Sequence, residues 1–209
     1  MGHPLRQLDP FGVYHVVSRG NNGSAIVHDA IDRAGFRERL DRTARKCEWE
    51  VFAWCLMTTH FHFVLRAPEG CISDGMQVLN TRHAQAINCR HGRTGHLFQN
   101  RFFSVEVATE AHFVASTAYV NRNPLAAFAV EAAEDWRDSS FRATMGLERA
   151  PDWLAVDEVL GVFGRSPASA RAALAERVSS GRVPVSDTLE LVRRYELRGI
   201  LPELAATSG

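Results

Sequence analysis

Cysteine, lysine and long apolar runs are all scarce in this chain of 209 residues. Its four cysteines have neither the paired spacing of metal or redox motifs nor the density of a disulfide scaffold, so we expect reduced thiols in a cytoplasmic protein. No run of about 18 apolar residues occurs, which argues against a membrane span. The polar residues 1–10 lack the apolar core of a signal peptide, which argues against export.

Charge is balanced over the whole chain but not along it. There are 24 basic and 24 acidic residues, and Lys46 is the only lysine. The stretch from Gly75 to Val105 contains arginines and histidines but no acidic residue. Because salt confines each charge to a range of about 10 Å, such a strip can bind phosphates even on a neutral protein. A solvated, arginine-rich face accounts for the same composition equally well.

Hydrophobic periodicity predicts alternating strands and helices in the first two thirds of the chain. The expected order is strand, helix, two strands joined by a short break, helix and strand, over residues 12–19, 29–46, 49–57, 60–66, 73–91 and 97–107. This order is that of the split βαβ, or ferredoxin-like, arrangement. A further helix over residues 110–123 should stop at Pro124.

Residues after Arg149 show helical patterns and no strand signal, over 152–163, 167–180 and 187–198. We therefore predict an α+β fold in two parts. Residues 1–148 form a catalytic domain with a ferredoxin-like sheet and helices on one face, and residues 149–209 form an all-helical C-terminal extension.

His60 and His62 flank Phe61 in one predicted strand. Alternate strand residues share a face, so the two imidazoles project together while Phe61 faces the core. Two imidazoles at this spacing can chelate a divalent metal. For an isolated motif of this kind, a pair of hydrogen-bonded structural histidines is the more common explanation.

Tyr119 and Asn123 are four residues apart in a predicted helix and share one of its faces. This face can present a phenol nucleophile beside an amide oxygen that completes a metal site. The alternatives are that Tyr119 is a half-buried packing residue and that Asn123 only closes the helix before Pro124.

Taken together, these motifs resemble the HUH tyrosine transposases of the smallest bacterial insertion sequences, and most of all the REP-associated tyrosine transposases. The resemblance spans residues 12–146 and rests on residues 14–22, 55–62, 90–102 and 119–124, in that order. Thr58-Thr59 replaces an expected Pro-Asn, and Val120-Asn121-Arg122 replaces a more usual Ile-His-Leu. Neither change touches a proposed catalytic side chain.

The resemblance implies metal-dependent cleavage and rejoining of single-stranded DNA through a 5′-phosphotyrosine at Tyr119, without ATP. His60 and His62, with Asn123 as third ligand, would hold Mg²⁺ or Mn²⁺, and because imidazoles are soft ligands for Mg²⁺, Mn²⁺ should bind at least as well. The sequence names no clear base for the phenolic proton. The partner would be single-stranded or hairpin DNA at palindromic repeats, bound by a monomer or homodimer associated with the nucleoid.

Polar residues near the first strand and in the basic stretch are the candidate DNA contacts. They are Arg19, Asn21, Asn22, Arg82, Arg93, His96, Gln99 and Arg101. Phe98, Phe102 or His96 could stack on unpaired bases, although strand alternation places some phenylalanines in the core. Two other functions stay open: a catalytically silent nucleic-acid-binding protein, and a metal-dependent nuclease in which Tyr119 merely packs.

Overall fold

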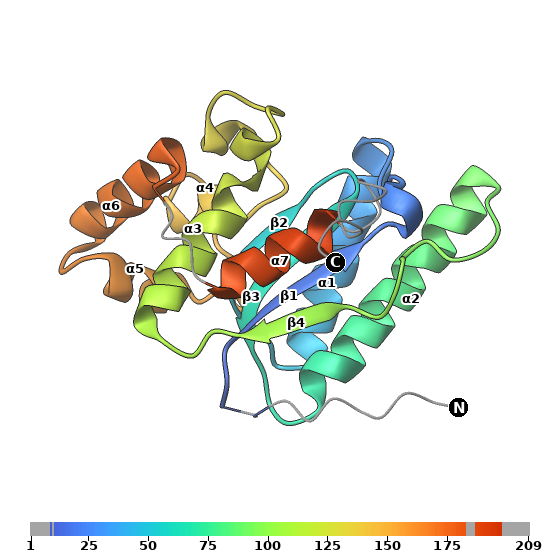
Figure 1. The fold of residues 1–209 in the computed structure, drawn as a ribbon, viewed down its shortest axis with the longest axis horizontal. Helices are drawn as coiled ribbons and strands as arrows, with labels where there is room; N and C mark the ends of the chain where they lie inside the picture. Colours follow the sequence, from blue (N-terminus) through green and yellow to red (C-terminus); the bar gives the residue numbers. More distant parts are fainter. Residues whose placement is uncertain (1–8, 10, 183–186, 198–209) are drawn as a thin grey trace, which may run out of the picture.

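A four-stranded antiparallel sheet forms the centre of the protein (Figure 1). The computed structural model describes residues 9, 11–182 and 187–197; the parts of the predictions that fall on residues 1–8, 10, 183–186 and 198–209 lie outside them. The strands lie in the order β2-β3-β1-β4 and comprise β1 (Tyr14–Arg19), β2 (Glu50–Leu56), β3 (His60–Arg66) and β4 (Phe103–Glu106). This order and the intervening helices confirm the predicted ferredoxin-like fold.

Helices α1 (Ala30–Lys46) and α2 (Cys71–His91) cover one face of the sheet. Asp29 begins α1 by accepting hydrogen bonds from the amides of Ile31 and Asp32, and Gly92 ends α2 in a left-handed conformation, φ 60°. Phe61, Phe63 and Leu65 of β3 are fully buried beneath these helices, in the main core.

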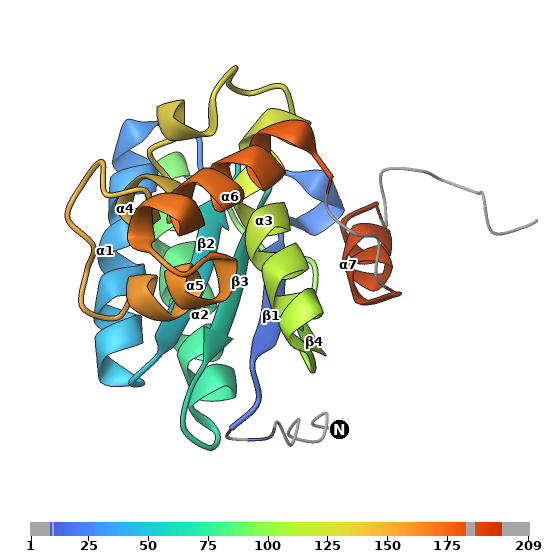
Figure 2. The same ribbon diagram turned by 90° about the vertical axis from the view of Figure 1, so that its left-hand side faces the viewer.

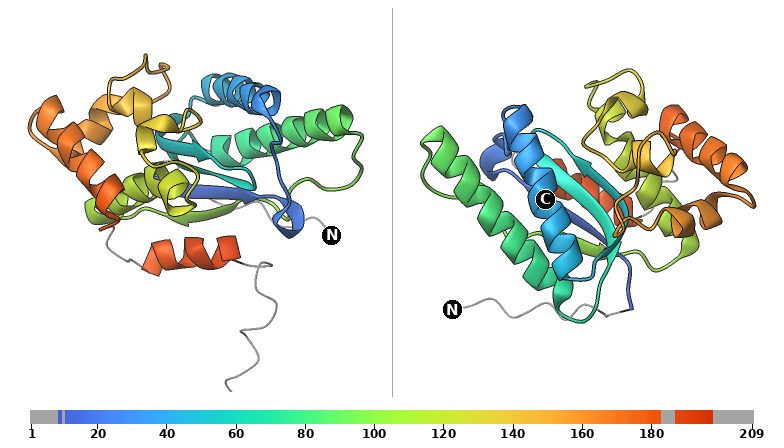
Figure 3. Two further views of the ribbon diagram at one scale, coloured as in Figure 1. Left: turned by 90° about the horizontal axis from the view of Figure 1, so that it is seen from above. Right: turned by 180° about the vertical axis from the view of Figure 1, so that it is seen from behind.

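The opposite face is also covered, by α3 (Glu110–Ala126) and α7 (Asp187–Leu197), as Figures 2 and 3 show. The two helices inside the βαβ units share one face as predicted. A second helical layer forms because β1 and β4 also present apolar side chains to the other side, among them Val17 and Val105.

Three predicted boundaries are wrong. The helix predicted over 152–163 begins only at Val156. Residues 97–102 are a loop rather than part of β4, joined to the end of β1 by a bridge between Gly20 and Phe98. Helix α3 continues through Pro124 to Ala126. Proline removes one backbone donor, to the carbonyl of Val120, and the helix ends within a turn, so the cost stays local.

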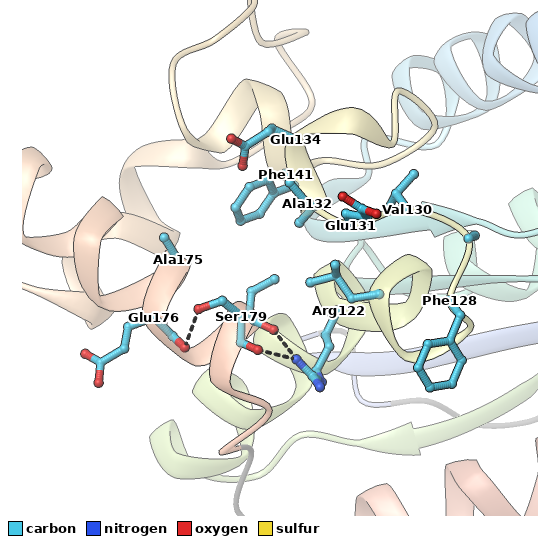
Figure 4. Close-up of a pocket in the computed structure, with 14 residues that line it drawn as sticks. Arg122, Phe128, Val130, Glu131, Ala132, Glu134, Phe141, Ala175, Glu176 and Ser179 are labelled. Carbon is cyan, nitrogen blue, oxygen red and sulfur yellow. Dashed lines mark hydrogen bonds between the residues drawn. The ribbon is translucent and has the colours of Figure 1, made fainter.

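Of the helices in the predicted C-terminal extension, α5 (Val156–Phe163) and α6 (Pro167–Ser180) pack beside α3, whereas α7 packs on the sheet. The short elements outside the extension are a 3-10 turn after β1 (Asn21–Gly23), a second 3-10 turn (Ala133–Asp135) and α4 (Phe141–Thr144). Arg122 of α3 donates hydrogen bonds to the carbonyls of Val178 (2.5 Å) and Ser179 (2.8 Å) at the end of α6, beside a pocket of about 850 Å³ (Figure 4). The division of the chain at residue 148 stays a prediction.

Among the described residues, none of the helices combines the length and apolar composition that crossing a bilayer requires.

Candidate active site

Strands β1 and β3 place three imidazoles on the face covered by α3 and α7. His60 and His62 project from β3 with ring centroids 5.0 Å apart, which confirms that they share a face. His15 of β1 lies beside them, with its Nε2 3.1 Å from Nδ1 of His62. The sequence analysis did not single out His15. This residue shares a face of β1 with Val17, and β1 pairs with the strand that carries the other two histidines.

Helix α3 brings the predicted tyrosine and asparagine to these histidines. The Oδ1 atom of Asn123 lies 3.4 Å from Nε2 of His60, and its Nδ2 donates a hydrogen bond to the backbone carbonyl of Tyr119 (3.1 Å). The ring of Tyr119 lies 5.9 Å from the rings of both His62 and His15. All four predicted catalytic and metal-binding side chains therefore converge at one place.

Glu196 of α7 completes this cluster, and the sequence analysis missed it. Its Oε2 accepts a hydrogen bond from the hydroxyl of Tyr119 (2.8 Å), and its Oε1 lies 3.1 Å from Nε2 of His62. Its one sequence signal is weak: Glu196 follows Val192 by four residues and so borders the apolar face of the last helix.

Three apolar side chains hold α7 in place. Leu189, Val192 and Tyr195 are buried, and the Tyr195 ring stacks on Phe103 of β4 with centroids 4.9 Å apart. On the polar side, the guanidinium carbon of Arg193 lies 5.6 Å from the centre of the Tyr119 ring.

Burial and neighbouring charges set the protonation states of the site. Burial and the nearby His62 lower the pKa of His15 to about 3 and that of His60 to about 4. Burial and the charge of Glu196 raise the pKa of Tyr119. Burial opposes ionisation of Glu196, but His62, His60 and the Tyr119 hydroxyl outweigh it and lower its pKa to about 2. At neutral pH the site therefore contains a carboxylate, a protonated phenol and neutral imidazoles at His15 and His60.

The facing atoms of His62 and Glu196 suit a cation. Although Nε2 and Oε1 are 3.1 Å apart, neither has a hydrogen-bond partner among the described residues. One ligand atom each from His60, His62 and Glu196 lies within 4.8 Å of the others. Nitrogen and oxygen donors at such distances fit a divalent metal ion.

The structure brings only some of the candidate DNA contacts together. His96, Gln99 and Arg101 line a cleft of about 540 Å³ between α2 and the loop after it. Gln99 is also attached to the end of β1, where its backbone N–H donates a hydrogen bond to the backbone carbonyl of Arg19 (2.9 Å).

The others are distributed around this cleft or away from it. The backbone N–H of Asn21 donates a hydrogen bond to the Leu97 carbonyl in the same loop (2.8 Å). Asn22 is exposed and has a left-handed backbone conformation, φ 52°. Arg93 reaches the Ala25 carbonyl, and Arg82 lines a separate groove between α1 and α2.

The expectation that some of these phenylalanines belong to the core is confirmed. Phe102 is 8% exposed and lies in the main core, and the half-buried Phe98 packs edge-on against Phe61 with ring centroids 6.0 Å apart. Stacking on unpaired bases stays a prediction.

Comparison with known proteins identifies the family. The profile described as "Transposase IS200 like" matches residues 12–123. A solved REP-associated tyrosine transposase bound to a REP hairpin is similar in fold, with 19% identity and a TM-score of 0.59 over 72% of this chain and 89% of that one. A putative transposase from Deinococcus radiodurans R1 has 17% identity and a TM-score of 0.39, over 54% and 89% of the two chains. No curated protein matches. The chain belongs to the IS200-like transposase family.

Proposed function

We propose that this transposase cuts and rejoins single-stranded DNA through a covalent 5′-phosphotyrosine at Tyr119. The observation that supports the proposal is convergence: the phenol of Tyr119 and the Asn123 amide, both on α3, lie against the histidine pair of β3. A tyrosine with only a packing role would not need a histidine pair and an amide oxygen beside it.

His60, His62 and the Oδ1 atom of Asn123 are the residues that would hold Mg²⁺ or Mn²⁺. Nε2 of His62 supports this assignment: it is buried, makes no hydrogen bond of fitting geometry with a described residue, and faces the Glu196 carboxylate at 3.1 Å, an arrangement that a bound cation would satisfy. When bound, the ion supplies Lewis-acid polarisation of the scissile phosphate. The imidazole donors favour Mn²⁺ over Mg²⁺.

Tyr119 then acts as the nucleophile. Its oxygen bonds to phosphorus while the bond from phosphorus to the 3′ oxygen breaks, and overall one proton moves from the phenol to the departing 3′ hydroxyl. The hydrogen bond to Oε2 of Glu196 directs the phenolic proton to one side and leaves a lone pair of the Tyr119 oxygen for attack. Because the phosphoester is kept, the 3′ hydroxyl of another strand can reverse the step without ATP.

We propose hairpin-bearing single-stranded DNA as the substrate. The relative of similar fold is bound to a REP hairpin. In this chain, the cleft lined by His96, Gln99 and Arg101 offers polar and cationic groups for a phosphate backbone.

A gel assay tests the proposal. The protein is incubated with end-labelled, hairpin-bearing single-stranded DNA and Mn²⁺, and the products are separated under denaturing conditions. We expect a covalent adduct that is lost in Tyr119→Phe and kept in Tyr195→Phe, which removes the other phenol on the same face of the sheet. Cleavage without an adduct would instead indicate a nuclease, and binding without cleavage a silent DNA-binding protein; either outcome contradicts the proposal.

A further inference from the structure

Glu196 lies in α7, far beyond residues 12–123 that the family profile matches. We propose that its carboxylate is a protein ligand of the active-site cation, so that the C-terminal helix completes a site formed by His60, His62 and Glu196. The inference rests on the metal site of the proposed function and adds a ligand to it.

The first support comes from the orientation of the two histidines. Nδ1 of His60 lies 3.0 Å from Oγ1 of Thr59, and Nδ1 of His62 lies 3.1 Å from Nε2 of His15. Histidine ligands of metals usually donate the proton of their other nitrogen to such a partner. With its proton at Nδ1, His62 turns the lone pair of Nε2 toward Oε1 of Glu196 (3.1 Å), while Nε2 of His60 faces Oδ1 of Asn123 (3.4 Å), the amide oxygen that the proposed function also assigns to the cation.

The second support is the unmatched contact at that space. A lone pair on Nε2 of His62 and the carboxylate oxygen Oε1 of Glu196 repel each other at 3.1 Å unless a cation or a proton lies between them. Their geometry does not fit a hydrogen bond, and neither atom has another hydrogen-bond partner within the described part of the chain. A divalent cation satisfies both atoms at once.

The third support is the second oxygen of the same carboxylate. Oε2 accepts the hydrogen bond of the Tyr119 hydroxyl (2.8 Å), so Glu196 joins the cation position to the nucleophile through its two oxygens. Two imidazoles, the Asn123 amide oxygen and one carboxylate form a ligand set that suits Mn²⁺, and an octahedral ion would keep two positions for a substrate. With a cation bound, the same carboxylate would add a link between α7 and the histidines of β3 to the apolar contacts that already hold the helix.

The test measures metal binding without DNA. Free Mn²⁺ is followed by electron paramagnetic resonance while it is titrated into the full chain and into variants. We expect Glu196→Gln to bind Mn²⁺ at least tenfold more weakly than the wild type, since even the loss of an outer partner of a metal ligand costs about 10- to 100-fold. The control is Glu190→Gln on the same helix, whose carboxylate pairs with Arg194 (2.5 Å); it should bind like the wild type.

A second measurement separates ligation from a merely structural role. Mn²⁺ should slow tryptic cleavage after Arg193 and Arg194 in the wild type and in Glu190→Gln, but not in Glu196→Gln, whose cleavage rate without metal provides the baseline.

The outcomes distinguish this inference from the function on which it rests. If His62→Ala abolishes Mn²⁺ binding while Glu196→Gln binds as tightly as the wild type or more tightly, the carboxylate only fills the site and the inference is overturned alone. If the wild type binds no Mn²⁺, or His62→Ala binds it normally, the metal site itself is overturned.

Discussion

Shortening one buried side chain should increase the fraction of molecules in which α7 is detached from the sheet, while the sheet stays folded. Helix α7 has 11 residues, a length at which an isolated helix is marginal in water, so it depends on its packed face. Val192 is central to that face: it is fully buried and lies in one apolar cluster with Val17 of β1. The perturbation we choose is Val192→Ala.

The expected magnitude follows from the groups removed. Two methyl groups leave the contact with the sheet, each contributing about 0.8 kcal/mol, and the incompletely filled space brings the total to about 2 kcal/mol. Because 1.4 kcal/mol corresponds to a factor of ten, the undocked population should rise about 25-fold. The global unfolding midpoint should change little, because the main core beneath α1 and α2 lacks Val192.

Limited trypsin digestion measures the undocked population. Arg193 and Arg194 lie inside α7, and cleavage after them requires the helix to open, so its rate follows the open fraction when reclosing is fast. We expect Val192→Ala to be cut about 25-fold faster than the wild type. Leu191→Ala is the control, since Leu191 is 47% exposed on the same helix. Equal rates for Val192→Ala and Leu191→Ala would refute the docking argument.

Three further perturbations address the core and the metal. Burial lowers the pKa of the fully buried His83 to about 4, so below about pH 6.5 the unfolded chain binds a proton that the folded one refuses. The free energy of unfolding should therefore fall by about 1.4 kcal/mol per pH unit from this residue as pH drops toward 4, and His83→Leu should reduce that slope in urea titrations; an unchanged slope contradicts the assignment. A Cβ on Gly75 would lie 2.5 Å from Cζ2 of Trp49, so Gly75→Ala should cost about 1–3 kcal/mol in thermal unfolding. In Gly161→Ala the added Cβ meets open space, so this variant should not lower the stability of the protein. If both variants had the same thermal stability, the expected clash between residue 75 and Trp49 would be refuted. Mn²⁺ at about 100 times its Kd should add about 2.7 kcal/mol to the free energy of unfolding, a gain that EDTA must reverse if the ion binds only the folded state.

Short-range patterns in the sequence determined much of the fold. The alternation of His60, Phe61 and His62 correctly predicted which face each side chain occupies, because the geometry of a strand imposes a period of two. Helix starts were equally local: the side chain of Asp29 caps α1, and Ser166 with Pro167 begins α6. The motif resemblance brought Tyr119 and the histidines into one hypothesis before any distance was known.

Only the tertiary structure decided what meets the nucleophile. Glu196 is 77 residues from Tyr119 in the chain, yet their side chains are joined by a 2.8 Å hydrogen bond. Periodicity in the last helix predicted an apolar face but not the surface on which it packs, because an apolar helix face can pack on many different apolar surfaces. The same holds for the basic stretch, where folding places His96 in a cleft beside α2 and Arg82 in a different groove. A pattern along the chain records which way a side chain points locally, whereas its neighbours depend on packing between distant segments.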